Sequence, residues 1–229
     1  MEKIVILTGA GISAESGLGT FRDADGLWEK YPIEQVATPQ GFARNPTLVH
    51  EFYNMRRRDA RAARPNAAHD ALARLQRDWD GEVVIVTQNV DGLHEAAGAS
   101  VMHMHGRLDS ACCMACTARW PAPDTMSPAD ACPQCGATET RPDIVWFGEI
   151  PQQMDEIAQH IGEAGIFASI GTSGQVYPAA GFVREARLTG AKTVELNLER
   201  SEISAAFDSH HMGLATQVVP AWVADLLAP

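Results

Sequence analysis

The sequence predicts an α/β protein with a Rossmann-like, doubly wound parallel sheet and a smaller second domain. Short apolar runs alternate with helical patterns along most of the 229 residues, as they do when helices connect parallel strands. A glycine-rich turn directly follows the first apolar run. Two segments, 31–65 and 107–141, interrupt the alternation, which indicates excursions from the main sheet.

Five apolar runs are expected to be the strands of this sheet. They are residues 4–7, 83–86, 166–170, 193–196 and 216–219. An alanine-rich stretch, 67–78, follows Pro65 and Asn66 and predicts a helix that belongs to the large domain. Segment 31–65 is expected to be helical, with breaks near Pro32, Pro39 and Pro46.

The two interruptions also predict how the chain is divided. The large Rossmann-like domain is expected to comprise residues 1–30, 66–106 and 142–229. The small domain is expected to combine a helical module, 31–65, with a cysteine-rich module, 107–141. An apolar content of 45% suffices for a full hydrophobic core, so a disordered chain is excluded.

Charge and hydropathy restrict the possible partners. The formal net charge of −11 repels nucleic-acid phosphates at long range. A cluster of arginines in residues 56–64 is the one basic run, and such a run is usually the solvated face of a helix. No apolar stretch is long enough to span a bilayer, and no apolar leader precedes the first strand. We therefore expect a cytoplasmic protein without nucleic-acid or membrane partners.

All five cysteines lie between residues 112 and 135, and in a reducing compartment such a cluster indicates a metal rather than disulfides. Fifteen residues separate two C-x-x-C pairs, which is the spacing of a zinc ribbon. Four thiolates leave no open coordination position, so a structural zinc ion is favoured over a catalytic one. Cys112 is the surplus thiol, because its use would give a less suitable C-x-x-x-C spacing. The expected ligands are Cys113, Cys116, Cys132 and Cys135.

The glycine-rich turn indicates a cradle for a pyrophosphate group. Gly9 and Gly11 can take positive φ and let the backbone approach a ligand, and the helix expected to follow offers unpaired N–H groups. The acidic ribose anchor that usually comes about 20 residues later is missing. A polar and aromatic segment stands in its place, and we interpret it as a loop that closes over the ligand. A tight turn without a ligand remains the alternative.

Three polar runs are expected to converge on one edge of the sheet. Residues 87–94 and 171–178 directly follow buried runs, at the carboxyl end where open α/β sheets bind ligands. Residues 102–107 meet the cysteine-rich module, and clefts between domains often hold small-molecule sites. This third run contains His105, although a histidine taken alone more often has a structural role.

Seven blocks resemble those of the sirtuin family, class III, of the bacterial CobB type. In chain order they are G-A-G-I-S, T-F-R-D, T-Q-N-V-D-G-L-H, H-M-H-G, the two C-x-x-C pairs, I-V-W-F-G-E and G-T-S-G-Q-V-Y-P, and they span essentially the whole chain. The resemblance implies an NAD-dependent protein-lysine deacylase with a structural zinc ion. In such an enzyme the acyl oxygen attacks the nicotinamide ribose, nicotinamide leaves, and the acyl group ends as 2′-O-acyl-ADP-ribose.

The resemblance assigns different roles to the histidines. His105 matches the general base, since a neutral imidazole can accept the proton of a ribose hydroxyl near pH 7. His94 and His103 match non-catalytic positions. His210 and His211 are expected in a late loop without polar neighbours.

The resemblance also implies a set of NAD contacts, in which amides and a carboxylate orient the ribose. The adenine side is specified least, because residues 208–213 depart from the family pattern. The expected contacts are Gly9, Ala10, Gly11, Ser13, Ala14, Glu15, Phe21, Arg22, Asp23, Trp28, Gln88, Asn89, Val90, Asp91, Gly171, Thr172, Ser173, Asn197, Leu198, Glu199 and Ala215.

Acyl specificity is expected from Tyr53 and Arg56, which share a helix face and match the Y-x-x-R pair of class III sirtuins. A phenol and a guanidinium can bind a carboxylate, so succinyl-, malonyl- or glutaryl-lysine is expected beside acetyl-lysine. The alternative is that Arg56 is one of several exposed arginines. Ala14 leaves room in the pocket, whereas the effect of Gly19 is not specified. The strand expected to pair with the substrate backbone comprises Val145, Trp146, Phe147, Gly148 and Glu149.

Two other functions remain open from the sequence. The same ribosyl chemistry could deliver ADP-ribose to a protein side chain, as in a mono-ADP-ribosyltransferase. A non-catalytic NAD sensor could use its zinc ribbon to bind a partner, although a base beside the ribose has no use there. For the deacylase, the expected partners are acylated lysine side chains of proteins, and the chain is expected to act as a monomer.

Overall fold

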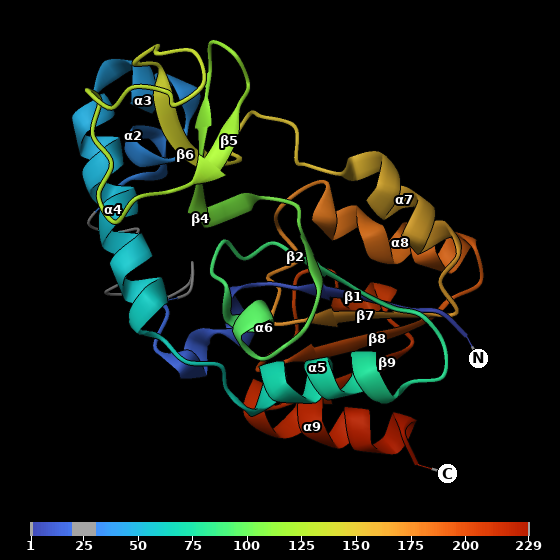
Figure 1. Cartoon of the computed structure of the whole chain (residues 1–229). Helices are drawn as coiled ribbons and strands as arrows, with labels where there is room; N and C mark the ends of the chain where they lie inside the picture. The colour runs from blue at the N-terminus through green and yellow to red at the C-terminus, as the bar shows by residue number, and fades with distance from the viewer. Residues whose placement is uncertain (1, 20–30, 229) are drawn as a thin grey trace.

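The structure is a computed structural model that describes residues 2–19 and 31–228. Four of the expected NAD contacts, Phe21, Arg22, Asp23 and Trp28, lie outside these residues. Figure 1 shows a large part with helices on both faces of a sheet, and a smaller part formed by helices and a second sheet. The Rossmann-like fold class is thereby confirmed.

The large sheet has six parallel strands in the order β3-β2-β1-β7-β8-β9. After β1 the chain builds the sheet toward β3, then returns to β7 on the other side of β1. Open α/β sheets bind ligands at the carboxyl ends of the strands where the order reverses, here between β1 and β7. The strands are β1 (Ile4–Thr8), β2 (Val83–Thr87), β3 (Val101–His103), β7 (Ile166–Ile170), β8 (Lys192–Asn197) and β9 (Ser209–Met212).

Two pairs of helices cover the sheet, one pair on each face (Figure 1). On one face, α5 (Ala67–Asp78) packs against α9 (Ala215–Leu226) over Ile4 and Ile6. On the other face, α7 (Met154–Gly162) and α8 (Phe182–Leu188) cover Val5 and Leu7. Because both faces are buried, the central strands are mostly apolar, as the sequence predicted for a parallel sheet.

Two features of the large sheet were not predicted correctly. Residues 216–219 belong to α9 and are not a strand, because Val219 and Val223 lie four apart and share the helix face that packs against α5. A short run rich in β-branched residues, such as Thr216, Val218 and Val219, fits either element. In addition, β3 and β9 were not expected, since each is a short strand containing histidine at an edge of the sheet.

The smaller part combines helices with a three-stranded antiparallel sheet in the order β5-β4-β6. The predicted breaks are confirmed, because Pro39 and Pro46 each begin a helix and Pro32 precedes one. The division into domains at residues 31–65 and 107–141 stays a prediction. The elements are α2 (Ile33–Val36), α3 (Pro39–Arg44), α4 (Pro46–Ala62), β4 (Gly106–Cys113), β5 (Arg119–Pro121) and β6 (Thr140–Ile144).

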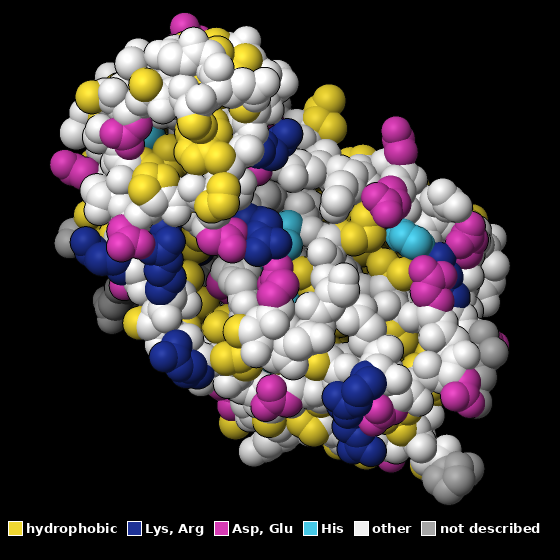
Figure 2. All heavy atoms as spheres, in the orientation of Figure 1, with side chains coloured by type: hydrophobic (Ala, Val, Ile, Leu, Met, Phe, Trp, Pro, Cys, Tyr) yellow, Lys and Arg dark blue, Asp and Glu magenta, His cyan; other side chains and the backbone are white. Residues whose placement is uncertain are grey.

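The arginines of α4 are not a uniformly solvated face. Arg57 is 1% exposed, and its Nε donates a hydrogen bond of 2.6 Å to the Leu108 carbonyl of β4. Its Nη1 donates to Asn54 Oδ1. The Asn54 side chain also bonds to the backbone of Met126, because its Oδ1 accepts the Met126 N–H and its Nδ2 donates to the Met126 carbonyl. Arg57 therefore holds the helix to the small sheet. On the face shown in Figure 2, basic and acidic side chains are interspersed and no large basic patch is seen.

None of the helices in the described part of the chain has both the length and the apolar character needed to cross a membrane.

The loop after β1 packs against the loop after β7 so closely that both need glycine. A Cβ atom on Gly9 would lie 2.8 Å from the Gly171 carbonyl oxygen, and one on Gly11 would lie 2.7 Å from the Gly171 Cα atom. Neither Gly9 nor Gly11 has a positive φ, so the prediction that they use left-handed backbone is wrong. Their role is to permit contact between the two loops.

Residues 10–19 do not form the α-helix expected directly after this turn. Two 3-10 turns, η1 (Ala10–Ile12) and η2 (Ala14–Ser16), follow β1 instead. Two further 3-10 turns, η3 (Ala179–Gly181) and η4 (Ser204–Ala206), lie in the second half of the chain. The Asn66 side chain ties the start of α5 to this loop, since its Nδ2 donates to the Ile12 carbonyl oxygen at 2.9 Å.

The glycine contact predicts a stability difference between two Gly→Ala variants. Gly11→Ala should lower the free energy of unfolding by about 1–3 kcal/mol, because its methyl group meets backbone that cannot move aside. Gly181→Ala is the matched control, since a Cβ there has nothing within 4 Å, and it should change stability by less than about 0.5 kcal/mol. Urea unfolding of the zinc-loaded variants measures both, and equal effects would contradict the contact.

Candidate active site and metal centre

The three polar runs do converge at the carboxyl edge of the large sheet. Backbone hydrogen bonds join neighbouring loops: Gln88 donates to the Thr8 carbonyl at 2.9 Å, and Gly9 donates to the Ile170 carbonyl at 3.0 Å. The backbone N–H of Met104 donates to the Thr87 carbonyl at 3.1 Å. The loops after β1, β2, β3 and β7 therefore form one continuous edge.

A buried network at this edge orients Asn89 and Asp91. The Asn89 Nδ2 donates to the Gly9 carbonyl at 3.1 Å and to Ser13 Oγ at 3.2 Å. Ser13 Oγ in turn donates to Asp91 Oδ2 at 3.1 Å. Burial raises the pKa of Asp91, although the hydrogen bonds from Leu93 and Ser13 act in the opposite direction. Thus Ser13 links two side chains predicted to hold the ribose.

Two buried histidines support this network. His69 Nε2 lies 3.5 Å from Ser13 Oγ, and His94 Nε2 lies 3.0 Å from Thr8 Oγ1. Burial lowers the pKa of His69 to about 4 and that of His94 to about 3, so both rings are neutral at pH 7. Sequence reasoning did not find His69. Its signal is a capping box, in which the His69 ring accepts the backbone N–H of Asn66 at the start of α5.

His105 lies at the same edge, directly after β3. Its Nδ1 lies 3.1 Å from the Gln88 carbonyl oxygen, which can only accept, so Nδ1 carries the proton. Within the described residues this is the ring's one hydrogen bond, and it leaves Nε2 as an unprotonated acceptor. Burial lowers the pKa of His105 below 6.5, although the bond to Gln88 acts to raise it. The ring is therefore neutral at pH 7 with a basic nitrogen available.

The loop after β7 continues the edge toward β8. Thr172 is buried and shares a hydrogen bond of 2.8 Å with Ser169. The Asn197 Nδ2 donates to the Thr172 carbonyl at 2.7 Å, which holds the ends of β7 and β8 together. Leu198 beyond it is 62% exposed. These residues lie in a row that leads away from His105.

Two residues on the expected adenine side have partners within the protein. The Glu15 carboxylate accepts both the backbone N–H and the hydroxyl of Thr216, at 3.0 and 2.7 Å, and so caps the start of α9 next to Ala215. His210 is on β9, where its Nδ1 lies 3.2 Å from the buried carboxylate of Glu195. The expectation of a loop without polar neighbours is therefore wrong.

Tyr53 and Arg56 lie on α4, as predicted. Tyr53 is buried, and its hydroxyl accepts a hydrogen bond of 3.0 Å from Trp146 Nε1. Burial raises the pKa of Tyr53 to about 12, so the phenol keeps its proton and can donate it. Arg56 is half-buried, with its guanidinium over the Phe52 ring at 5.9 Å. The alternative of a freely exposed Arg56 does not hold.

Residues 145–149 form a turn after β6 and not the expected strand. Glu149 closes this turn by accepting the Trp146 N–H at 2.8 Å and pairing with both Nη atoms of Arg141 at 2.7 and 2.8 Å. The Val145 N–H donates to the His105 carbonyl at 2.9 Å, and Phe147 is 44% exposed. The turn thus joins the His105 loop to the small sheet.

The four cysteines of the C-x-x-C pairs meet at the tips of two matching turns. In each turn the N–H of the first cysteine donates to the residue five positions on: Cys113 to the Ala118 carbonyl at 2.9 Å, and Cys132 to the Ala137 carbonyl at 2.8 Å. The residue after the second cysteine has a left-handed backbone in both, Thr117 with φ 61° and Gly136 with φ 76°. Two equivalent turns therefore present the thiols to each other.

The sulfur geometry suits a tetrahedral zinc ion. All four Sγ atoms lie within 4.8 Å of one another, and two of the pairs are 3.7 Å apart. Zn–S bonds of about 2.3 Å in a tetrahedron require S–S distances of about 3.8 Å. Cys112 lies outside the set, and burial raises the pKa of its thiol to about 11. With four thiolates the ion would be structural.

Zinc binding predicts different outcomes for two cysteine variants. Cys116→Ala should lose the zinc ion and unfold the cysteine-rich segment, because the metal supplies much of the folding free energy of such a small unit. Cys112→Ala should retain one zinc ion per chain. Elemental analysis of the purified variants, with circular dichroism, distinguishes them. Zinc loss in Cys112→Ala, or full retention in Cys116→Ala, would show that the ligand set is wrong.

Comparison with known proteins agrees with this geometry. A model of the Sir2 family matches residues 9–178, more than half of the chain. The NAD-dependent protein deacylase of Caulobacter vibrioides is 56% identical over 231 residues, which cover 99% of this chain and 97% of that protein.

Solved structures show the same likeness. The NAD complex of a Sir2 homolog has a TM-score of 0.90 and 36% identity, and covers 99% of this chain and 91% of that chain. Sir2Af2 bound to a myristoylated histone peptide has a TM-score of 0.75 and 31% identity, and covers 98% and 90%. Since the family model, the sequence identity and the fold all agree, this chain belongs to the Sir2 family.

Proposed function

We propose that this protein is an NAD-dependent protein-lysine deacylase whose general base is His105. The observation that carries the proposal is the free Nε2 of a neutral imidazole at the carboxyl edge of the large sheet, next to the loop after β2. The full-length likeness to a protein named NAD-dependent protein deacylase, and to a Sir2 homolog solved with NAD, supports this function. Proteins carrying acylated lysine are the proposed substrates, as Sir2Af2 with its acylated peptide suggests.

The chain's residues divide the work in this reaction. Bound NAD supplies a ribose whose nicotinamide can leave when the acyl oxygen attacks. The His105 Nε2 accepts the proton of a ribose hydroxyl, and its Nδ1–H bond to Gln88 holds the ring in the tautomer that can do so. Asn89 and Asp91, fixed by Ser13, orient the sugar and oppose the positive charge that develops on it.

Tyr53 and Arg56 are proposed to bind a carboxylate at the end of the acyl chain. The Tyr53 hydroxyl receives the Trp146 N–H, so its own proton is directed to another acceptor. Arg56 is the cation on the same helix face, and its charge acts on both Tyr53 and Asp91. A succinyl or malonyl carboxylate between the two groups would gain charge-assisted hydrogen bonds. We therefore expect desuccinylase and demalonylase activity beside deacetylase activity.

Removal of the base predicts a loss of turnover with a defined pH dependence. His105→Ala should lower kcat for deacylation by about 10²–10⁴-fold. In the wild type, kcat/KM should fall as acid protonates the ring, and because burial lowers the pKa of His105, the midpoint should lie below pH 6.5. His160→Ala, on α7, is the control and should remain active. Nicotinamide release from NAD with an acylated peptide measures the turnover of His105→Ala and of His160→Ala, and the pH profile of the wild type. Transfer of ADP-ribose to protein that persists in His105→Ala would instead support a transferase.

Removal of the guanidinium predicts a selective loss. Arg56→Met should lower kcat/KM for succinyl and malonyl peptides roughly 30- to 150-fold, which corresponds to a loss of about 2–3 kcal/mol of transition-state stabilisation. It should change kcat/KM for the acetyl peptide by less than about threefold. Arg58→Met, two positions along α4 and exposed, is the matched control and should alter none of them. Equal losses on all three peptides in Arg56→Met would refute the carboxylate site.

A further inference from the structure

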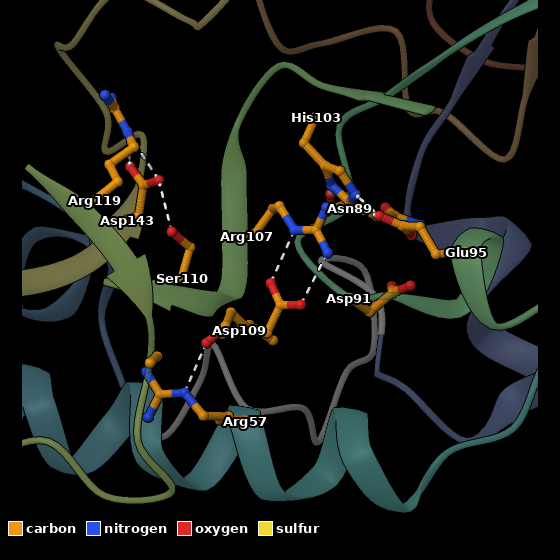
Figure 3. Close-up of polar contacts among 12 residues, drawn as sticks. Arg57, Asn89, Asp91, Glu95, His103, Arg107, Asp109, Ser110, Arg119 and Asp143 are labelled. Carbon is orange, nitrogen blue, oxygen red and sulfur yellow. Dashed lines mark hydrogen bonds and ion pairs between the residues drawn. The ribbon is translucent and has the colours of Figure 1, made fainter. Parts of the chain in front are cut away.

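His103 makes two hydrogen bonds that a neutral imidazole cannot make together. Its ring is 6% exposed at the end of β3. Nδ1 lies 3.0 Å from the Asn89 carbonyl oxygen, and Nε2 lies 2.8 Å from Glu95 Oε1 on α6 (Leu93–Ala96). Figure 3 shows the ring directed toward Glu95, with Asn89 next to it in the view.

Both partners are acceptors. A backbone carbonyl has no proton to donate, and an ionised carboxylate has none either. Burial acts to raise the pKa of Glu95, but the hydrogen bond from His103 and the charges of His103 and Arg107 hold it below its usual range. A neutral ring carries one N–H, so one of the two short contacts would place two acceptors against each other. Only an imidazolium satisfies both.

We propose that His103 is a positioning residue that acts as an imidazolium, clamping the Asn89 carbonyl to the Glu95 carboxylate and thereby fixing the loop of residues 88–91. The role in catalysis rests on the function proposed above, whereas the protonation of the ring does not.

The clamp acts on the part of the loop that the reaction uses. His103 and His105 hold the consecutive carbonyls of Asn89 and Gln88. The Asn89 side chain points the other way, to Gly9 and Ser13. His103 therefore fixes the backbone carbonyl of Asn89, and the loop after β1 fixes the side-chain amide of Asn89. Without the clamp, both Asn89 and the partner of His105 can shift, and small displacements of such groups are costly.

The charges around the ring come from several elements. Glu95 on α6 faces Nε2 and is shared with Arg107 of β4, whose Nη1 lies 3.0 Å away. Arg107 also pairs with Asp109 through two bonds of 2.8 Å. The charge of His103 acts to lower the pKa of Asp91 and that of Asp109. Burial lowers the pKa of His94, so that ring is neutral. Glu95 is thus the carboxylate in contact with the ring, and Arg107 and Asp109 continue the chain of charges beyond it.

The two histidines then set opposite limits on the reaction. His105 must be neutral to accept a proton, so activity falls on the acid side. His103 must be charged to hold the loop, so activity falls on the alkaline side. If Glu95 loses its charge, the imidazolium is less stable and gives up its second proton at lower pH. The alkaline limit should therefore move to lower pH, and the acid limit should not move.

Nitrogen-15 NMR of the histidine rings tests the protonation without relying on activity. In the zinc-loaded wild type at pH 7.5, the ring of His103 should show two protonated nitrogens, assigned by their loss in His103→Gln. Glu95→Gln keeps the shape and an acceptor but removes the charge, and its ring should lose the second proton at a pH lower by about one unit. A single protonated nitrogen in the wild type would overturn the proposal, whatever the enzyme's activity.

Kinetics of the same variants test the positioning role. For Glu95→Gln, kcat should fall about tenfold or more with the peptide KM nearly unchanged, and the alkaline limb of kcat/KM should move to lower pH by about one unit. Asp109→Asn breaks the exposed end of the same chain of charges and should stay within about twofold. Loss of thermal stability in Glu95→Gln without any movement of the alkaline limb would overturn the positioning role. An inactive wild type with a doubly protonated His103 would instead refute the proposed function alone.

Discussion

The close contact between Gly9, Gly11 and Gly171 is the constraint on which the rest of the site depends. It brings the loops after β1 and β7 together where the strand order reverses, within a distance that no side chain permits. The adjoining loops are then fixed by short bonds: Asn89 reaches the Gly9 carbonyl, and Asn197 reaches the Thr172 carbonyl. The glycines therefore act through packing between two loops, and the polar residues use the edge that this packing creates.

Local environment assigns opposite charge states to two histidines in one short segment. His105 faces a carbonyl with one nitrogen and keeps the other free, so its buried ring is neutral. His103 faces acceptors with both nitrogens and lies beside Glu95. Residue type alone cannot distinguish them, since both follow β2 by similar distances in the sequence. The difference comes from α6, which places a carboxylate beside one ring and not the other.

Much of the fold could be predicted from the sequence because its signals are local or strongly patterned. Buried strands such as β2 contain continuous apolar runs, prolines mark the starts of α3 and α4, and the cysteine spacing is typical of two equivalent turns. The errors came from segments whose conformation is decided by tertiary contacts. Residues 216–219 are helical because they pack on α5, and residues 145–149 turn because Arg141 and Glu149 pair across them.

The site could be predicted in its parts but not in its connections. The motifs specified Asn89, Asp91 and His105, yet nothing in the sequence shows that Ser13 bridges the first two or that Glu15 caps α9. Such links join residues far apart in the chain, so only the folded edge reveals them. The same holds for His69 and for the charged contacts of His103.

The most direct measurement of the central claim is a crystal structure of the zinc-loaded protein with NAD and an acyl-lysine peptide. The dinucleotide should lie along the carboxyl edge between β1 and β7, with a hydroxyl of the nicotinamide ribose within hydrogen-bond distance of His105 Nε2. A dinucleotide bound elsewhere, or a His105 ring whose Nε2 faces away from the ribose, would contradict it.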